Sequence, residues 1–289
     1  MHYTGNVIRP PSEAGSIILQ VTTGCSHNKC TFCGAYKDQP FTIKDHKIVK
    51  EDLEFASKHC KKQNRLFLAD GDVFILSKKK LIELLLEIRS VLPWVNKVSL
   101  YGSAKAIRSK TIDQLQELKT LGLHRVYMGL ESGCDEILQQ IKKNETSKSM
   151  IEAGQTVRAA GLFLSVTALL GLGGKALSRQ HAIETAATLN SMKPNQIAVL
   201  TLMILENTPL ASNIANGSFN LLSPLEILKE LYHLLENLSD IRCQFHANHA
   251  SSYLPLAGRL PKDHKFLLQH VADAIEGSIE TVPEHRRAL

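Results

Sequence analysis

Hydrophobic and polar positions define two kinds of segment that alternate along the chain. Short apolar runs rich in Ile, Val and Leu, such as residues 16–21 and 66–69, predict buried strands. Longer stretches with apolar side chains at helical spacing follow them, as in residues 79–91, and predict amphipathic helices. The predicted strands are residues 16–21, 66–69, 97–101, 124–130, 162–170 and 196–203. The predicted helices are residues 45–59, 79–91, 109–121, 148–160, 178–192, 224–238 and 263–276.

This alternation of apolar strands and helices indicates parallel βα units rather than an antiparallel sheet. Six such units span residues 16–203. In parallel βα folds the chemistry gathers at the carboxyl ends of the strands. The unusual residues of this chain follow those ends, in segments 25–33, 70–72, 102–103, 131–132 and 171–174. The shared location predicts a functional site at that edge of the sheet.

Composition and charge narrow the class of protein. The 289 residues are 44% hydrophobic and 21% charged, as in ordinary globular domains, which excludes a disordered or fibrous chain. The long apolar stretch at residues 81–92 carries charges and is too short to span a bilayer. The N-terminus has no signal-peptide pattern, so we expect a cytoplasmic protein without a membrane partner. The net charge of +6 is spread along the chain, which argues against a nucleic-acid partner.

Three of the six cysteines, Cys25, Cys30 and Cys33, lie within nine residues in a C-x4-C-x2-C pattern. In a cytoplasmic chain such a group indicates metal binding rather than disulfides. Three thiolates can hold three corners of a cubane [4Fe–4S] cluster and leave the fourth iron open to a substrate. The alternative is a zinc site with His27 or a distant cysteine as the fourth ligand, although zinc sites usually have two separated ligand pairs. The remaining cysteines are expected to be buried apolar side chains: Cys60, Cys134 and Cys243.

The cysteine segment resembles the cluster loop of the radical S-adenosylmethionine (radical SAM) enzymes. Their commonest spacing is C-x3-C-x2-C, after the first strand of a partial (β/α)6 barrel, with an aromatic residue before the last cysteine, where this chain has Phe32. The chain departs by one extra residue between Cys25 and Cys30, as do superfamily variants with a longer first gap. The resemblance implies an α/β fold: a partial (β/α)6 TIM-like barrel over residues 1–205 and a helical extension over residues 206–289.

Further segments resemble SAM-binding motifs of the same superfamily, in the expected order. Gly71 and Asp72 lie where the family has a Gly-Gly-Glu-like motif that receives the methionine amino group. Arg158 resembles an arginine that pairs with the SAM carboxylate in the coproporphyrinogen-oxidase-like branch, and Gly171 belongs to a glycine motif that lets the adenine approach the backbone. The SAM-contacting residues implied by the resemblance are Phe32, Gly71, Asp72, Ser103, Glu131, Arg158 and Gly171.

These residues also have purely structural interpretations. Asp72 is a common turn residue. Glu131 is placed to cap the next helix or to pair with Arg125. Arg158 is also typical of a surface residue at a helix end, and Gly171 of a left-handed turn.

The resemblance implies an oxidoreductase that uses a [4Fe–4S] cluster to cleave SAM reductively to a 5′-deoxyadenosyl radical. That radical would abstract hydrogen from a small or medium-sized substrate of unknown identity. The electron would come from a one-electron reductant such as flavodoxin or ferredoxin. The alternative is a non-catalytic zinc- or cluster-binding βα-barrel scaffold, which needs no glycines or acidic residues at the strand ends. His246 and His249 lie in a polar segment that either contacts substrate or holds the last helix in place.

Overall fold

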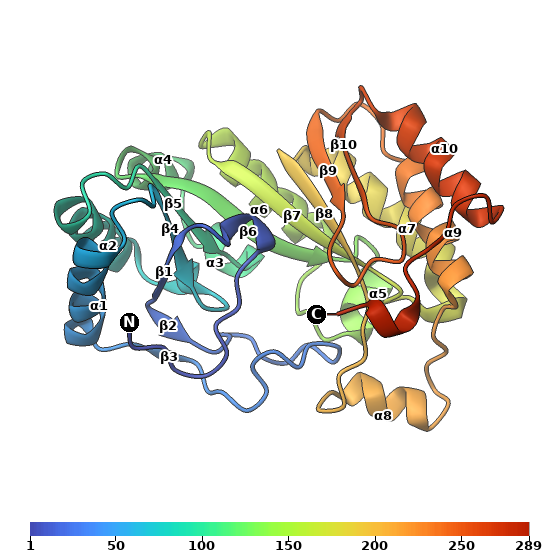
Figure 1. The fold of residues 1–289 in the computed structure, drawn as a ribbon, viewed down its shortest axis with the longest axis horizontal. Coiled ribbons are helices and arrows are strands. Elements are labelled where there is room, and N and C mark those ends of the chain that lie inside the picture. The colour runs from blue at the N-terminus through green and yellow to red at the C-terminus, as the bar shows by residue number, and fades with distance from the viewer. Residues whose placement is uncertain (289) are drawn as a thin grey trace. The chain divides into compact units, whose positions relative to one another are not determined.

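The structure, a computed structural model, describes residues 1–288 (Figure 1). The chain forms two compact units. The first consists of residues 1–28, 35–128 and 156–164, and the second of residues 29–34, 129–155 and 165 onward. No helix within residues 1–288 is long and apolar enough to cross a membrane.

The first unit contains a parallel sheet. Its strands are, in spatial order, β1 (Ile17–Gln20), β4 (Arg65–Ala69), β5 (Lys97–Tyr101) and β6 (Leu123–Glu131), of which residues 129–131 belong to the second unit. A short antiparallel pair, β2 (Thr22–Thr23) and β3 (Thr42–Ile43), follows β1 in the chain and brackets the segment with the first cysteine. The helices and 3-10 turns are η1 (Pro11–Glu13), α1 (His46–His59), η2 (Val73–Ile75), α2 (Lys78–Val91), α3 (Ala104–Arg108) and α4 (Ile112–Thr120).

Local chemistry explains where these elements begin. Asp45 and Ser77 accept backbone N–H groups in the first turns of α1 and α2, and Thr111 forms a capping box with Gln114 at the start of α4. β4 is buried on both faces, which accounts for its unbroken apolar sequence.

The second unit continues the βα pattern. Here β7 (Phe163–Leu170), β8 (Gln196–Thr201) and β9 (Cys243–Ala247) are parallel neighbours, and β10 (Leu256–Leu260) pairs antiparallel with β9. The helices are α5 (Asp135–Gln140), α6 (Ser147–Ala159), α7 (Gly174–Met192), α8 (Pro209–Ala215), α9 (Pro224–Glu236) and α10 (His264–Ile275), followed by the 3-10 turn η3 (Glu284–Arg286). The end of α6, from residue 156, belongs to the first unit. The mostly parallel strands with intervening helices confirm the predicted α/β class.

All of the predicted strands are present, and the two predicted C-terminal helices are present as α9 and α10. The helix expected over residues 109–121 is present as α4, with Thr111 at its N-cap, whereas the short helix α3 before it was not predicted. The strands β9 and β10 were not predicted. In β9, buried Cys243, Phe245 and Ala247 alternate with the less buried Gln244 and His246. This alternation is typical of a strand, but the many polar residues of the segment favoured the prediction of a loop.

Candidate active site

The segment that carries Cys25 leaves the sheet of the first unit through the β2–β3 pair. Thr23 fastens the two stems of this loop, since its Oγ1 lies 2.7 Å from Thr42 Oγ1 and donates to the Pro40 carbonyl at 3.2 Å. Gly24 follows with φ +70°, and a Cβ there would lie 2.9 Å from the Pro40 carbonyl oxygen. The stem is therefore packed tightly just before Cys25, which is itself half-buried.

Gly71, at the end of β4, lies against this cysteine loop. A Cβ at Gly71 would come within 2.9 Å of the Gly24 carbonyl oxygen and 3.2 Å of the Cys25 Cα. Both neighbours are backbone atoms that have little freedom to move. The absence of a side chain at Gly71 thus allows the backbone at Cys25 to approach the strand end.

Asp72 joins two of the loops at the carboxyl ends of the strands. Its side chain is buried and accepts hydrogen bonds from Ser26 Oγ at 2.6 Å, Ser103 Oγ at 2.8 Å and the Ser103 N–H at 3.1 Å. Three of the residues predicted to form the site therefore meet in the first unit: Gly71, Asp72 and Ser103. Asp72 does more than form a turn, because its carboxylate connects the cysteine loop to the start of α3 through hydrogen bonds.

Asp70 lies on the other side of Gly71 and has a separate set of partners. It accepts hydrogen bonds from Gln20 Nε2 at 2.7 Å and from the Tyr36 hydroxyl at 3.1 Å. Burial raises the pKa of the Asp70 carboxyl above its usual range, while the donors from Gln20 and from the backbone at Ile8 oppose that shift. The same burial and the Asp70 charge raise the pKa of Tyr36.

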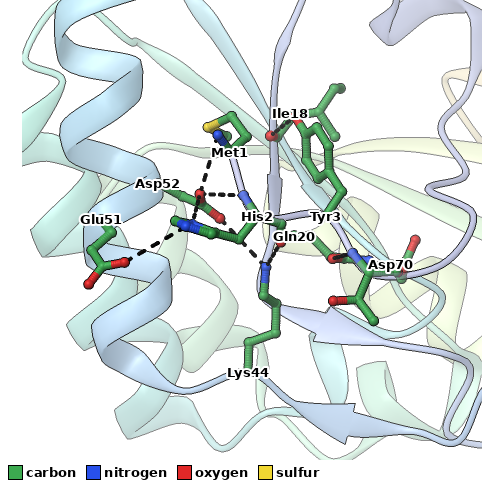
Figure 2. A network of polar contacts seen from close by, with 10 residues as sticks. Met1, His2, Tyr3, Ile18, Gln20, Lys44, Glu51, Asp52 and Asp70 are labelled. Carbon is green, nitrogen blue, oxygen red and sulfur yellow. Dashed lines mark hydrogen bonds and ion pairs between the residues drawn. The ribbon is translucent and has the colours of Figure 1, made fainter.

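Figure 2 shows that Gln20 links Asp70 to the N-terminal segment. The Gln20 side chain donates to the Thr4 carbonyl and accepts from the Thr4 N–H, both at 2.9 Å. The segment is fixed at its other end by fully buried Asp52 on α1, which accepts from the His2 N–H at 2.6 Å and lies 3.5 Å from Lys44 Nζ. Sequence reasoning missed Gln20, although a polar residue inside an otherwise apolar strand was a usable signal.

Lys110 is a second residue that sequence reasoning missed. It is buried, and its Nζ donates to the Phe74 carbonyl at 2.7 Å and to the Ala106 carbonyl at 3.2 Å. Burial lowers the pKa of this amine to about 8, and the Asp72 charge opposes the shift. Lys110 therefore fastens η2, which follows Asp72, to α3, which follows Ser103.

Cys30 and Cys33 belong to the second unit and are half-buried. Between them the Thr31 backbone donates to the Ile141 carbonyl and accepts from the Leu210 N–H, both at 3.0 Å. Phe32 packs against a cluster of apolar side chains: Cys134, Ile137, Leu138, Ile141, Leu172, Leu202 and Leu210. These contacts anchor the part of the loop that carries the last two cysteines.

Glu131, at the end of β6, has a positive φ of +64°. Its Oε1 accepts a hydrogen bond from Lys143 Nζ at 2.9 Å, so the pairing with Arg125 expected as an alternative is wrong. It does not cap the next helix either, since the residue at the N-cap of α5 is Cys134.

Gly171, at the end of β7, adopts φ +91°, a left-handed conformation that favours glycine. Its N–H donates to the buried carboxylate of Glu230 at 2.6 Å. Both Glu131 and Gly171 therefore lie at strand ends in the second unit, as the sequence predicted.

Arg158 is not brought to this edge of the strands. It is exposed in the last turn of α6, which leads into the first residue of β7. Nearby Gly161 approaches the end of the Lys119 side chain, and Lys119 is in the last turn of α4, which leads into the start of β6. Arg158 therefore lies at the amino-terminal edge of the strands, opposite Gly71 and Asp72 in the first unit. The helix-end motif resembled the family's, but its position along the strands does not fit the predicted contact.

The residues of the cysteine segment fit a metal cluster by their chemistry. Within residues 1–288 no disulfide is present and no group of three Cys, His, Asp or Glu side chains is already arranged around a metal position. The ligand assignment therefore rests on the spacing of the cysteines and on the close backbone packing at Gly24 and Gly71, which fixes the chain at Cys25. Of the remaining cysteines, Cys134 and Cys243 are buried as expected and Cys60 is only half-buried.

A parallel α/β fold with a three-cysteine loop after its first strand defines a class of cluster-binding enzymes. Residues 19–189 match the family model described as the Radical SAM superfamily. Because this match covers more than half of the chain, the chain belongs to the radical SAM superfamily. Membership implies a [4Fe–4S] cluster and SAM as cofactors and enzymatic chemistry on SAM.

Individual relatives are distant. The chain is 24% identical over 199 residues to a biotin synthase of Colwellia psychrerythraea, covering 68% of this chain and 55% of that protein. It is 24% identical over 172 residues to the heme chaperone HemW of Bacillus subtilis, covering 59% and 44%. The chain thus spans about half the length of these curated relatives.

Solved structures agree on the fold. The radical SAM methyltransferase TsrM of Kitasatospora setae, solved with cobalamin and a [4Fe–4S] cluster, gives a TM-score of 0.58 at 17% identity over 70% of this chain and 39% of that one. Coproporphyrinogen III oxidase (HemN) of Escherichia coli gives 0.56 at 18% identity over 77% and 52%. The similarity to these structures confirms the partial-barrel fold that the resemblance of the cysteine loop implied.

Proposed function

We propose that this chain binds a [4Fe–4S] cluster through Cys25, Cys30 and Cys33 and cleaves SAM reductively to start a reaction on a small or medium-sized substrate. When bound, a reduced cluster supplies the electron that splits SAM into methionine and a 5′-deoxyadenosyl radical. The observation that carries the proposal is the C-x4-C-x2-C loop, which leaves the first sheet where Gly71 lets its backbone approach β4.

The residues around the loop have roles that follow from their contacts. Asp72, with Ser26 and Ser103, holds the cysteine loop and the α3 start in one arrangement. Its buried carboxylate can also attract an ammonium group at this strand end. Gly171 and Glu131 lie at strand ends of the second unit, and Gly171 has no side chain that would obstruct a flat base. Phe32 positions the cysteine loop by packing and is assigned no contact with SAM. Arg158 is left out of the proposed site.

We assign the protein to the cytoplasm and to oxidoreductase chemistry, with a flavodoxin- or ferredoxin-type reductant and no nucleic-acid partner. The net charge of +6 suits docking to an acidic electron carrier.

The test is anaerobic reconstitution with iron and sulfide, reduction with dithionite, addition of SAM and detection of 5′-deoxyadenosine by mass spectrometry. We expect about four irons per chain, the count of one [4Fe–4S] cluster, and 5′-deoxyadenosine. The Cys30→Ala variant is expected to lose both. Cys60→Ala is the matched control, because this half-buried cysteine lies outside the triplet. Stoichiometric zinc, no iron and no 5′-deoxyadenosine in the unaltered protein would instead support the metal-binding scaffold.

A further inference from the structure

We propose that Glu230 and His181 are positioning residues that hold the ends of β6 and β7 in the shape required to bind SAM. This inference rests on the proposed function, which places the SAM-contacting residues Glu131 and Gly171 at those two strand ends. Neither Glu230 nor His181 lies in a segment that the sequence marks as part of the site.

Glu230 reaches the end of β7 from α9. Its side chain is buried, and one oxygen, Oε1, accepts the Gly171 N–H at 2.6 Å. The other oxygen accepts the hydroxyl of Ser178 on α7. A hydrogen bond to a carboxylate in a low-dielectric interior is stronger than one between neutral groups. The backbone at Gly171, which has φ +91°, is therefore fixed by a residue 59 positions later in the chain.

His181 reaches the end of β6 from α7. Its Nδ1 lies 2.8 Å from Ser132 Oγ, and its Nε2 lies 3.1 Å from the Leu169 carbonyl oxygen and 3.7 Å from the Glu230 carboxylate. The carbonyl can only accept, so a neutral ring donates from Nε2 and accepts the Ser132 hydroxyl at Nδ1. Ser132 Oγ then accepts the Cys134 N–H at 3.0 Å, and each polar atom in this row has a partner.

Thr185, one turn after His181, completes the support. Its hydroxyl accepts the Gly133 N–H at 2.9 Å. A Cβ at Gly133 would overlap the carbonyl oxygen of Glu184, so this loop is pressed directly onto α7. One network thus fastens the backbone at residues 132–134 and at Gly171 to α7 and α9.

The order Ser132, His181, Glu230 resembles the triad of a hydrolase, but burial excludes that chemistry. The exposed fractions of the three residues are 0%, 1% and 1%, so no substrate reaches the serine. A buried charged network is a costly way to join helices that apolar packing alone can join. Its donors and acceptors are instead matched to backbone groups at two loops, which indicates that it sets loop geometry.

The test compares Glu230→Ala and Glu230→Gln in reconstituted protein by anaerobic equilibrium binding of SAM and by the kinetics of 5′-deoxyadenosine formation. Glu230→Ala leaves the Gly171 N–H without an acceptor and should weaken SAM binding by about tenfold or more, mainly through KM. Glu230→Gln keeps an amide oxygen for Gly171 and should stay within about threefold of the unaltered protein. Glu236→Ala, an exposed residue at the end of the same helix, is the control and should have no effect.

The results separate this inference from the proposed function. If the unaltered protein assembles no cluster or binds no SAM, both the proposed function and this inference are wrong. If it binds SAM and folded Glu230→Ala binds SAM equally well, the inference alone is overturned. Should Glu230→Ala not fold, Thr185→Val removes the acceptor for Gly133 with little change in shape. Folded Thr185→Val is then expected to bind SAM several-fold more weakly, and an unchanged affinity would overturn the inference.

Discussion

Residues with similar chemistry have different roles here because of where the fold places them. Asp72 and Arg158 were both expected to contact SAM, and both belong to the first unit. Asp72 is buried between the cysteine loop and α3, whereas Arg158 is exposed at the opposite edge of the strands. A charge at a strand's carboxyl end can meet a ligand there, and a charge at the other end of the same βα unit cannot.

Replacing Arg158 by Ala should leave SAM affinity unchanged within about twofold, because exposed residues away from a site rarely contribute more than about 0.5 kcal/mol. Asp72→Asn, which removes the charge that faces Ser26 and Ser103, should weaken binding in the same assay. Equilibrium SAM titration of both reconstituted variants measures the difference. A marked loss of SAM affinity in Arg158→Ala would support the contact between Arg158 and SAM that the sequence predicts.

Lys110 gives a pH-dependent prediction. Its pKa is lowered to about 8 in the folded protein from 10.5, so the folded state disfavours the charged amine. The stabilising contribution is present above the unfolded pKa and is lost as the pH falls toward 8, by about 3 kcal/mol in all.

Denaturant unfolding of the unaltered protein and of Lys110→Met, from above pH 10.5 to below pH 8, tests this. The unaltered protein should lose stability relative to the variant as the pH is lowered, and the difference should level off below the folded pKa. A difference that is independent of pH would show that the amine titrates normally.

Whole elements depend on one another through single close contacts. The end of β4 and the cysteine loop come together only because residue 71 has no side chain.

Gly71→Ala should push the backbone at Gly24 and Cys25 away from β4, with a cost of about 1–3 kcal/mol in the free energy of unfolding and a lower iron content after reconstitution. Gly15→Ala is the control, because the nearest atom to its added Cβ is a side-chain nitrogen 3.9 Å away. Denaturant unfolding and iron analysis measure both effects. A Gly71→Ala protein with normal iron content and stability would show that the close approach is not needed.

At the scale of the whole molecule, the C-terminal residues complete the second unit. β9 pairs in parallel with β8, and α9 packs on α7 and supplies Glu230. The side chains of Leu231 and Leu234 on α9 are buried.

A chain of residues 1–205 should therefore aggregate or unfold without a cooperative transition, because β8 would lose its neighbouring strand and α7 its partner helix. Size-exclusion chromatography and thermal unfolding, with the full chain as the control, measure this. A monomeric fragment with a sharp transition would instead support an independent domain that ends at residue 205.

The sequence by itself determined the βα alternation, the α/β class and the cysteine triplet, because these depend on local hydrophobic period and on spacing along the chain. It also placed Gly71, Asp72, Glu131 and Gly171 after strand ends, since strand direction fixes which residues lie there. Only the tertiary structure decided what touches them. Asp72 meets Ser103, and Glu131 meets Lys143 rather than Arg125. Gln20, Lys110 and Glu230 act across 30 to 60 positions of chain, and no local pattern records a partner at that separation.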